Sequence, residues 1–337
     1  MTAPMAAPAS NPAPNPAPAL AVEDLRIEFP LPDGRRAAVV DGVSLSVETG
    51  HVLGLVGESG SGKSMIALAA LGLVPAPGRV TAGRVVVAGR DLARLSEREL
   101  RAVRGREVGI VFQDPMTGLN PVRRVGSLLV ESLRRHSGIG EAEARARALD
   151  ALKAVGIPAA ESRLDAYPHQ LSGGLRQRVT IALALVNRPR VILADEPTTA
   201  LDATIQAQIL DLLRARVADA AAVLITHDLG VAATICDRIA VIYAGRIVET
   251  GPAARVLSRP RHPYTAGLLA AAPRFDFARR PLVPIPGQPP RPGVLPAGCA
   301  FAPRCPRAAE RCRTDRPPPP SADGSTVACW FPTEAAA

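Results

Sequence analysis

The octapeptide GESGSGKS constrains the fold of this chain more than any other feature of its sequence. It follows the apolar run HVLGLV, which is typical of a strand, and it leads into KSMIALAALGLV, which is typical of a helix that begins at Lys63. In a glycine-rich turn of this kind, backbone N–H groups can converge on phosphates, and the helix N-terminus adds partial positive charge. The sequence therefore predicts a phosphate-binding loop that consists of Gly57, Glu58, Ser59, Gly60, Ser61, Gly62, Lys63 and Ser64.

Lys63 is unusual because the chain otherwise uses arginine for positive charge. The chain has 40 Lys and Arg residues, and of these only Lys63 and Lys153 are lysines. Lysine carries a compact charge on a flexible stem, whereas arginine presents a planar fork, so a cradle of backbone N–H groups has room for lysine. We expect Lys63 to reach the β- and γ-phosphates of a nucleotide and Ser64 to ligate Mg²⁺. An ordinary strand-to-helix turn, the alternative, does not explain why Lys and Ser stand in this register.

Segments typical of strands and helices alternate along much of the chain, which favours an α/β fold with a largely parallel sheet. A helical block over about 114–174 interrupts this alternation and is expected to form an inserted subdomain. We predict a disordered Ala/Pro-rich arm over 1–20, a nucleotide-binding domain over 21–251, and a Pro- and Arg-rich C-terminal extension over 252–337.

Targeting and membrane-spanning signals are not evident in the sequence. The first residues lack the basic start and the apolar core of a signal peptide, and no apolar run approaches the ~18 residues that span a bilayer. We expect any membrane to be contributed by other subunits, and the cysteines to be reduced. The net charge of +9 comes mostly from the C-terminal quarter, where a solvated basic surface is the simplest interpretation.

A second group of polar residues stands at the ends of predicted strands. The apolar run in VILADEP ends on Asp195 and Glu196, and the carboxyl ends of strands are where α/β sheets bind ligands. We expect Asp195 to hold the Mg²⁺ shell and Glu196 to act as general base on the attacking water. Adjacent acids also occur at solvated strand ends, but the phosphate loop upstream favours the catalytic interpretation. Gln113, after VGIVF, is expected to reach metal or water, and His227, after AVLIT, to contact the γ-phosphate.

The stretch LSGGLRQR supplies a second candidate anion site. Ser172, Gly173 and Gly174 precede an apolar helix and combine a hydroxyl, a bare backbone and a helix N-terminus. One chain has one phosphate loop, so two half-sites are explained if two domains dimerise head to tail and each closes the nucleotide site of the other.

Together these motifs resemble those of the ATP-binding cassette ATPases. The resemblance covers about 22–251 and rests on the order GESGSGKS, Gln113, LSGGLRQR, VILADEP, TALD with Asp202, and His227. It implies a RecA-like P-loop NTPase core with a helical subdomain at about 114–174, ATP and Mg²⁺ as cofactors, and a sandwich dimer that ATP closes. It also implies that a loop after Gln113 contacts a membrane partner and that an aromatic residue stacks on adenine, for which Phe29 is the candidate.

The C-terminal extension resembles that of one particular group of these ATPases. RPRHPYTAGLLAAAPR, IPGQPP, GCAFAPRCPRAAERCRTDRP and Cys329-Trp330 resemble the extension of oligopeptide and dipeptide importer ATPases, a group that includes nickel importers. The implied partners are a second ATPase in a heterodimer, two transmembrane permeases and an extracytoplasmic solute-binding protein, with no nucleic acid. The implied location is the cytoplasmic face of the plasma membrane. The alternatives are an importer of nickel or another small solute, and a soluble ATPase of the same superfamily. Soluble members usually carry coiled-coil arms or two cassettes, whereas this chain has one cassette and no heptads.

Four of the five cysteines lie close together in the C-terminal extension: Cys299, Cys305, Cys312 and Cys329. Their spacing differs from the paired C-x2-C pattern of zinc ribbons. The arginines between them would offset the negative charge of four thiolates around a [4Fe–4S] core. We expect these cysteines to ligate one such cluster, with zinc or free thiols as the alternatives. Cys236, far upstream, is expected to be a core residue.

Overall fold

The computed structural model describes residues 17–199, 201–272, 283–320 and 326–333, so most of the expected N-terminal arm lies outside the described residues. The strands form one sheet in the order β2-β1-β4-β5 and another in the order β11-β10-β9-β3-β8-β7-β6. The strands are β1 (Leu20–Pro30), β2 (Arg36–Val47), β3 (Val52–Val56), β4 (Arg79–Val87), β5 (Arg90–Asp91), β6 (Val108–Val111), β7 (Val191–Asp195), β8 (Ala221–Thr226), β9 (Arg238–Tyr243), β10 (Arg246–Pro252) and β11 (Thr326–Val327). The α-helices are α1 (Lys63–Ala69), α2 (Glu97–Val103), α3 (Pro115–Gly118), α4 (Val125–Ser137), α5 (Glu141–Ala154), α6 (Ala160–Arg163), α7 (Gly173–Leu185), α8 (Ala203–Val217), α9 (Leu229–Ile235), α10 (Ala253–Ser258), α11 (Pro263–Ala271) and α12 (Glu310–Thr314). Short 3₁₀ turns are η1 (Leu92–Arg94), η2 (Pro168–Gln170) and η3 (Ala302–Arg304).

The larger sheet carries the nucleotide motifs. Strands β6, β7, β8, β3 and β9 pair in parallel, and β10 returns antiparallel to β9. Every residue of β3, β7 and β8 is buried, as expected of parallel strands that are covered on both faces. Parallel pairing brings the carboxyl ends of β3, β7 and β8 to one edge of the sheet, so the segments that follow these strands lie near each other. This arrangement confirms the predicted α/β fold class.

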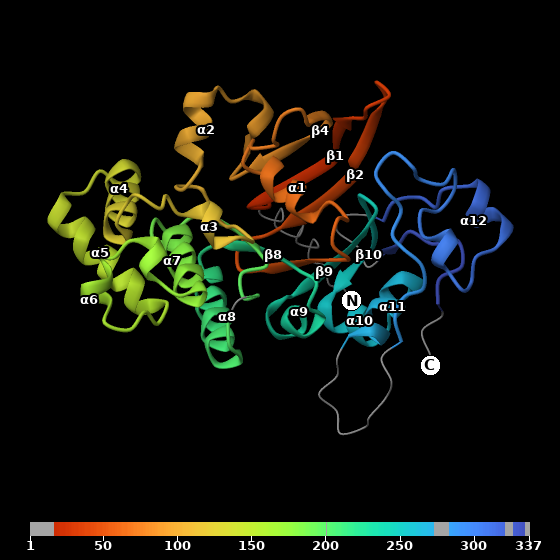
Figure 1. Cartoon of the computed structure of the whole chain (residues 1–337). Helices are drawn as coiled ribbons and strands as arrows, with labels where there is room; N and C mark the ends of the chain where they lie inside the picture. The colour runs from red at the N-terminus through yellow and green to blue at the C-terminus, as the bar shows by residue number, and fades with distance from the viewer. Residues whose placement is uncertain (1–16, 200, 273–282, 321–325, 334–337) are drawn as a thin grey trace, which may run out of the picture.

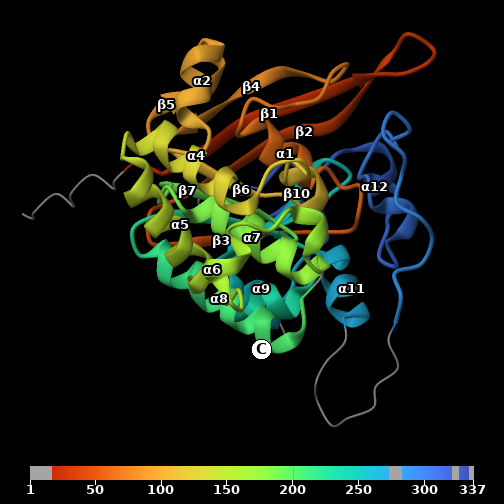
Figure 2. The ribbon, with the colours of Figure 1, turned by 60° about the vertical axis from the view of Figure 1, so that its left-hand side comes forward.

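Two hydrophobic clusters cover the two faces of this sheet. On one face, Leu55 of β3 and Ile225 of β8 pack with Ile66 of α1 and with Ile27 of the antiparallel sheet. On the other face, Val56 packs in the cluster that contains residues of α8 and α9. Figures 1 and 2 show α1 between the two sheets and α8 and α9 on the opposite face of the larger sheet. Alternate residues of one strand thus serve different layers, because successive side chains point to opposite faces.

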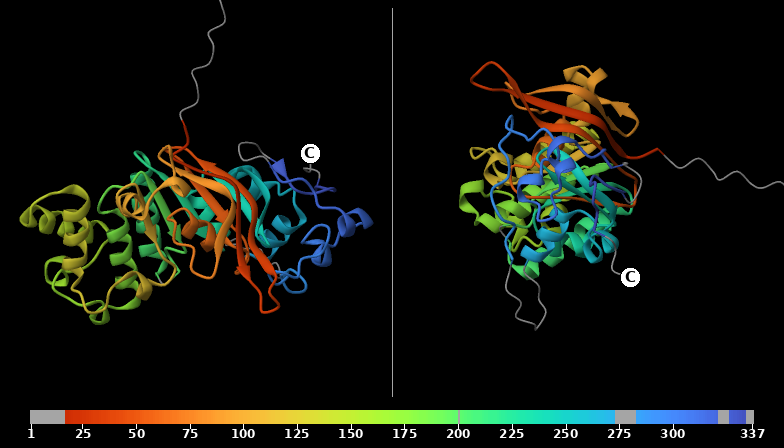
Figure 3. Two further views of the ribbon diagram at one scale, coloured as in Figure 1. Left: turned by 90° about the horizontal axis from the view of Figure 1, so that it is seen from above. Right: turned by 90° about the vertical axis from the view of Figure 1, so that its right-hand side faces the viewer.

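A group of helices, α3 to α7, lies between β6 and β7 in the chain. Its helices α4, α5 and α6 pack around side chains with no exposed surface, which include Leu129, Leu133 and Leu152. Helix α7 connects this subdomain to β7 and shares its hydrophobic cluster. The subdomain lies at one end of the molecule and the C-terminal extension at the other (Figure 3).

The C-terminal extension packs against the main sheet. Helices α10 and α11 contribute the fully buried Val256 and Tyr264 to the larger core cluster. Further along, β11 pairs antiparallel with β10, with Glu249 opposite Val327 and Thr250 opposite Thr326. The extension thereby adds an edge strand to the sheet that carries the nucleotide motifs. Within the described parts of the chain, no helix combines the length and the apolar character that a bilayer span requires.

Candidate active site

The phosphate loop runs from the end of β3 to the start of α1, and its glycines are required by close backbone contacts. A Cβ at Gly57 would lie 2.3 Å from the carbonyl oxygen of Ile242, and one at Gly62 would lie 2.7 Å from that of Val39. Gly62 also has φ 100° at the N-cap of α1, a left-handed conformation that glycine adopts without steric cost. The loop is therefore held against β2 and β9, where a larger residue would not fit.

Lys63 is the first residue of α1 and lies inside the loop with 7% of its surface exposed. Its Nζ donates hydrogen bonds to the carbonyl oxygens of Gly57 and Glu58, at 2.8 and 2.9 Å. Burial lowers the pKa of Lys63, while the nearby carboxylates of Glu196 and Asp195 act in the opposite direction. The ammonium is thus positioned between the loop and the acids at the end of β7.

Two of the three residues predicted to hold Mg²⁺ contact each other. Ser64 donates a hydrogen bond to the carboxylate of Asp195, the last residue of β7. Burial raises the pKa of Asp195, and the bond from Ser64 opposes this shift. A hydroxyl beside a carboxylate provides the oxygen donors that a hard cation such as Mg²⁺ prefers, so these residues fit the ion.

Glu196 and His227 form a second pair beside the first. Oε1 of Glu196 lies 2.6 Å from Nδ1 of His227 and also accepts the backbone N–H of His227, at 3.2 Å. The hydroxyl of Thr199 donates to Oε2 of Glu196, at 3.1 Å. Glu196 is buried and has φ 50°, a conformation that is uncommon for a residue with a side chain. The carboxylate is therefore fixed in direction, as a general base must be.

The other predicted residues occupy more exposed positions. Gln113 follows β6 and is exposed. Ser172 and Asp202 are the N-caps of α7 and α8, where their side chains accept the backbone N–H groups of Leu175 and Ile205. Phe29 lies near the end of β1, with its ring against Gly78. The structure thus gathers Lys63, Ser64, Asp195, Glu196 and His227 into one site, and it presents Ser172 at an open helix end.

Two residues that contact the site, Gln177 and Arg304, are not among the residues predicted from the sequence. Gln177 of α7 is buried and donates from Nε2 to the carbonyl oxygen of Pro197, at 2.9 Å, which connects the helix after Ser172 to the segment after Glu196. Glu58 of the phosphate loop is paired with Arg304 of the C-terminal extension. Only Gln177 had a sequence signal, since it lies within LSGGLRQR; Arg304 is one arginine among many.

The four cysteines of the extension line one small cavity, of about 20 Å³, together with His262 and Phe301. Within the described ranges, no three His, Cys, Asp or Glu side chains are grouped closely enough to hold a metal ion as they stand. Burial raises the pKa of the thiols of Cys299, Cys305 and Cys329, which favours the neutral thiol over the thiolate that binds metals. Cys236 is buried at the end of α9, and burial raises its pKa to about 12, as expected of a core thiol.

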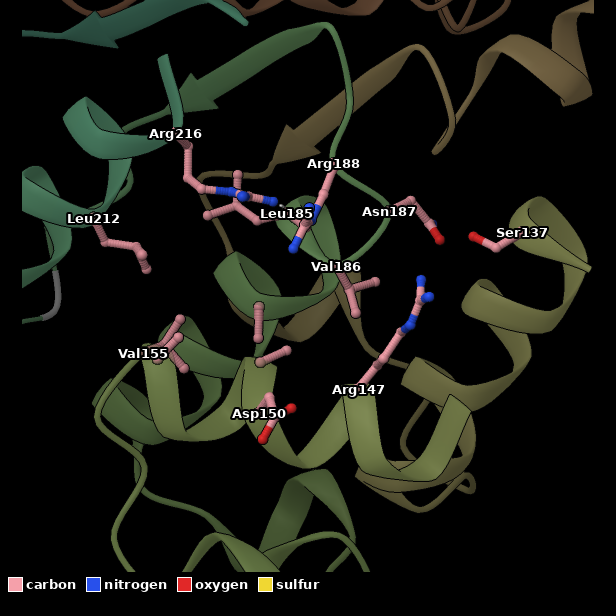
Figure 4. A pocket seen from close by; sticks show the side chains of 13 residues that line it. Ser137, Arg147, Asp150, Val155, Leu185, Val186, Asn187, Arg188, Leu212 and Arg216 are labelled. Carbon is pink, nitrogen blue, oxygen red and sulfur yellow. Dashed lines mark hydrogen bonds between the residues drawn. The ribbon is translucent and has the colours of Figure 1, made fainter. Parts of the chain in front are cut away.

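A larger cavity, of about 460 Å³, lies between α5, α7 and α8 (Figure 4). Arg147, Arg188 and Arg216 line it together with Asp150. Burial and the charge of Arg188 lower the pKa of Arg216. None of the residues predicted for the nucleotide site is among its lining residues, so this cavity is separate from the phosphate loop.

The whole arrangement is similar to that of known ATP-binding cassettes. The family model described as "ABC transporter" matches residues 40–199. A solved dimeric structure of an ATP-binding cassette, in a post-hydrolysis state bound to ADP and Pi, superposes with a TM-score of 0.62 at 29% identity and covers 69% of this chain and 98% of that one. The fold is therefore the RecA-like P-loop NTPase fold that the sequence predicts.

More similar relatives are known by sequence. The oligopeptide transport ATP-binding protein of Salmonella typhimurium is 48% identical over 317 residues, which are 94% of each chain. The dipeptide transport ATP-binding protein of Escherichia coli is 50% identical over 298 residues, which are 88% of this chain and 91% of that one. The model described as "Oligopeptide/dipeptide transporter, C-terminal region" matches residues 248–312. The chain therefore belongs to the ABC transporter family of ATP-binding proteins and is an ATPase.

Proposed function

We propose that this chain is the ATP-hydrolysing, energy-coupling subunit of an importer for dipeptides and oligopeptides. The observation that carries the proposal is the match of residues 248–312 to the C-terminal region of oligopeptide/dipeptide transporters, on a chain whose ATP-site residues come together. The similarity over most of the chain to oligopeptide and dipeptide transport ATP-binding proteins supports the same substrate class. In this proposal, ATP closes a dimer of two ATPase subunits, and the closure drives transport through partner permeases.

We assign the chemistry of hydrolysis to the side chains at the carboxyl edge of the sheet. Lys63 contacts the β- and γ-phosphates, where a preorganised positive charge stabilises the transition state. Glu196 accepts the proton of the attacking water as general base, and His227, 2.6 Å from its carboxylate, orients that carboxylate and contacts the γ-phosphate. When bound by Ser64, Asp195 and Gln113, Mg²⁺ neutralises charge on the phosphates.

We propose that Ser172, Gly173 and Gly174 bind the ATP of a partner subunit. Ser172 is exposed at the N-terminus of α7, a helix of 13 residues, and its position leaves the helix end accessible to an anion. The similar solved structure is described as dimeric, which supports this assembly. In our proposal the partner is a second, different ABC ATPase, so that the pair is a heterodimer.

The permease contact is proposed at the cavity beside Gln113. This cavity, of about 410 Å³, is lined by apolar residues of β6, α4 and α7, among them Ile110, Leu128 and Leu183, and by Phe112, which follows β6. Arg135 and Glu131 are among its charged residues. Apolar lining with a few charged groups suits a short amphipathic segment of a membrane subunit. The proposed complex contains two permeases and an extracytoplasmic solute-binding protein, with this chain peripheral at the cytoplasmic face of the plasma membrane and no nucleic acid.

We propose that the four cysteines hold a [4Fe–4S] cluster, with zinc as the alternative. Their convergence on one cavity supports a shared ligand, and so does His262, which lines that cavity with a buried Nε2 that has no hydrogen-bond partner in the described structure. Nδ1 of His262 accepts the backbone N–H of Tyr264, so the neutral ring carries its proton on Nε2 and can donate to a thiolate. Burial lowers the pKa of His262 to about 4, which keeps the ring neutral at pH 7. At about 20 Å³, the cavity must widen for a cluster and less so for a single ion.

The proposed function is tested by reconstituting the chain with the permeases encoded beside it, in vesicles that also receive the cognate binding protein. We expect ATP-dependent uptake of labelled dipeptides or oligopeptides, and no uptake in the matched complex that carries Glu196→Gln. Uptake of nickel without uptake of peptides would replace the proposed substrate class. Vigorous insertion of the isolated chain into lipid would contradict the peripheral assignment.

A further inference from the structure

The phosphate loop has a set of contacts that its own motif does not predict. The C-terminal extension reaches the loop at Glu58 through two side chains. The hydroxyl of Tyr264, on α11, accepts the backbone N–H of Glu58 at 2.8 Å. Arg304, at the end of η3, donates from its two terminal nitrogens to the two carboxylate oxygens of Glu58, at 2.7 and 2.9 Å. The extension thus holds both the backbone and the side chain of one loop residue.

Glu58 connects these contacts to Lys63. Its carbonyl oxygen accepts a hydrogen bond from Nζ of Lys63, so its N–H, its carbonyl and its carboxylate are all bonded. Any displacement of Glu58 therefore moves a carbonyl that holds the ammonium. Lys63 is the residue expected to meet the phosphates, so the geometry of Glu58 bears on nucleotide affinity.

Arg304 is held firmly enough to act as a fixed point. Only 6% of its surface is exposed. Its Nε donates to the carbonyl oxygen of Pro286 at 2.9 Å, and Nη1 also contacts the hydroxyl of Tyr243 at 3.3 Å. Its guanidinium carbon lies 6.0 Å from the ring centroid of Phe301. A planar fork with five donors makes these bonds together, which the single ammonium of lysine does not reproduce.

Arg304 also belongs to the cysteine-containing part of the extension. It precedes Cys305 directly, and the segment from Cys299 to Cys305 contains the whole of η3. The backbone N–H of Arg304 is bonded to the carbonyl of Phe301 within this segment. The conformation of this segment therefore determines where the guanidinium lies.

We propose that Arg304 is a positioning residue for nucleotide binding. Its bidentate ion pair with Glu58 holds the phosphate loop in the geometry that presents Lys63 to the phosphates, and this couples the C-terminal extension to ATP affinity. The inference rests on the assignment of residues 57–64 as the phosphate loop. It is independent of the transported solute.

Two simpler roles of Arg304 make different predictions. An arginine that only anchors the extension would affect stability without affecting nucleotide affinity. An arginine that acts only through its charge would favour ATP, and Glu58 would then disfavour it, so removing the two charges would shift affinity in opposite directions. A positioning role requires that removing either partner weakens binding and that removing both adds little further.

The experiment measures the dissociation constant of a non-hydrolysable ATP analogue with Mg²⁺ on the full-length chain, together with thermal unfolding. The variants are Arg304→Ala, Arg304→Lys, Glu58→Gln and the double variant Arg304→Ala/Glu58→Gln. We expect each single variant to raise the dissociation constant, by about tenfold for Arg304→Ala, which is the scale of one lost charge-assisted hydrogen bond. The double variant is expected to match the single variants. Arg313→Ala, on the exposed side of the same extension, is the matched control and is expected to stay within about twofold of the parent, a change below 0.5 kcal/mol.

Three results would overturn the proposal: an unchanged dissociation constant in Arg304→Ala with a lowered unfolding temperature, opposite shifts in the two single variants, or effects that multiply in the double variant. If Arg304→Ala does not fold, Arg304→Lys and Glu58→Gln carry the same test, because each weakens the bidentate pair and keeps the side chain's bulk. Lys63→Ala distinguishes a failure of the Arg304 proposal from a failure of the phosphate-loop assignment. It should abolish binding of the analogue, and retained binding would refute the phosphate-loop assignment itself.

Discussion

Replacing Glu196 by glutamine tests the central chemical assignment of the site. Glutamine keeps the shape of the side chain and an oxygen that can accept the backbone N–H of His227, which now donates to Oε1 at 3.2 Å. Its amide can also remain bonded to the hydroxyl of Thr199, so we expect the free energy of unfolding to change by less than about 1 kcal/mol. The amide cannot accept the proton of the attacking water.

The expected loss of hydrolysis follows from that difference. General-base catalysis contributes a factor of about 10² to 10⁴, which corresponds to about 3 to 5 kcal/mol of activation free energy. Nucleotide affinity should remain close to that of the parent, because Lys63 and the loop are unchanged. The assay compares the ATPase rate of the assembled complex with the dissociation constant for ATP in the same preparation. Glu161→Gln, on α6 with 66% of its side chain exposed, is the matched control. A hydrolysis rate within about tenfold of the parent would refute the assignment of Glu196 as base.

Further predictions concern the partner site, the cysteines and the core. Ser172→Arg should block hydrolysis in a mixed dimer while ATP binding to the variant's own phosphate loop persists; a defect confined to that loop would contradict the composite site. Anaerobic purification should give a brown protein that contains iron and sulfide, and Cys305→Ser should lose them while Cys236→Ser should not; one zinc without iron would indicate a zinc site, and the absence of both metals would indicate free thiols. Leu152→Ala should lower the free energy of unfolding by about 2 to 5 kcal/mol, because this side chain is fully buried in the helical subdomain. Leu73→Ala, at an exposed position, should have a far smaller effect in the same denaturant titration.

The ATP motifs can be predicted from the sequence because each consists of residues that lie close together along the chain. A phosphate loop needs glycines and Lys63 at a fixed spacing between a strand and a helix, and this spacing is visible as a short sequence motif. Asp195 and Glu196 follow a short apolar run, so their place at the end of a buried strand can be inferred without knowing the strand order. The α/β fold class and the inserted helical block follow in the same way from periodicity within single elements.

Contacts between distant segments leave no such pattern. The pairing of β11 with β10 depends on how the extension folds back over the sheet. Periodicity describes which face of an element is apolar, and it does not describe which remote element covers that face.

The ion pair between Arg304 and Glu58 shows this limit most clearly. The two residues are 246 positions apart, and in a chain that uses arginine for nearly all its positive charge nothing distinguishes Arg304 from its neighbours. The sequence by itself predicts that residues 57–64 bind phosphate, because adjacent residues set the backbone geometry and the charge at that turn. Only the tertiary structure shows that the C-terminal extension holds the loop. The ion pair depends on the fold, which buries Arg304 next to Glu58.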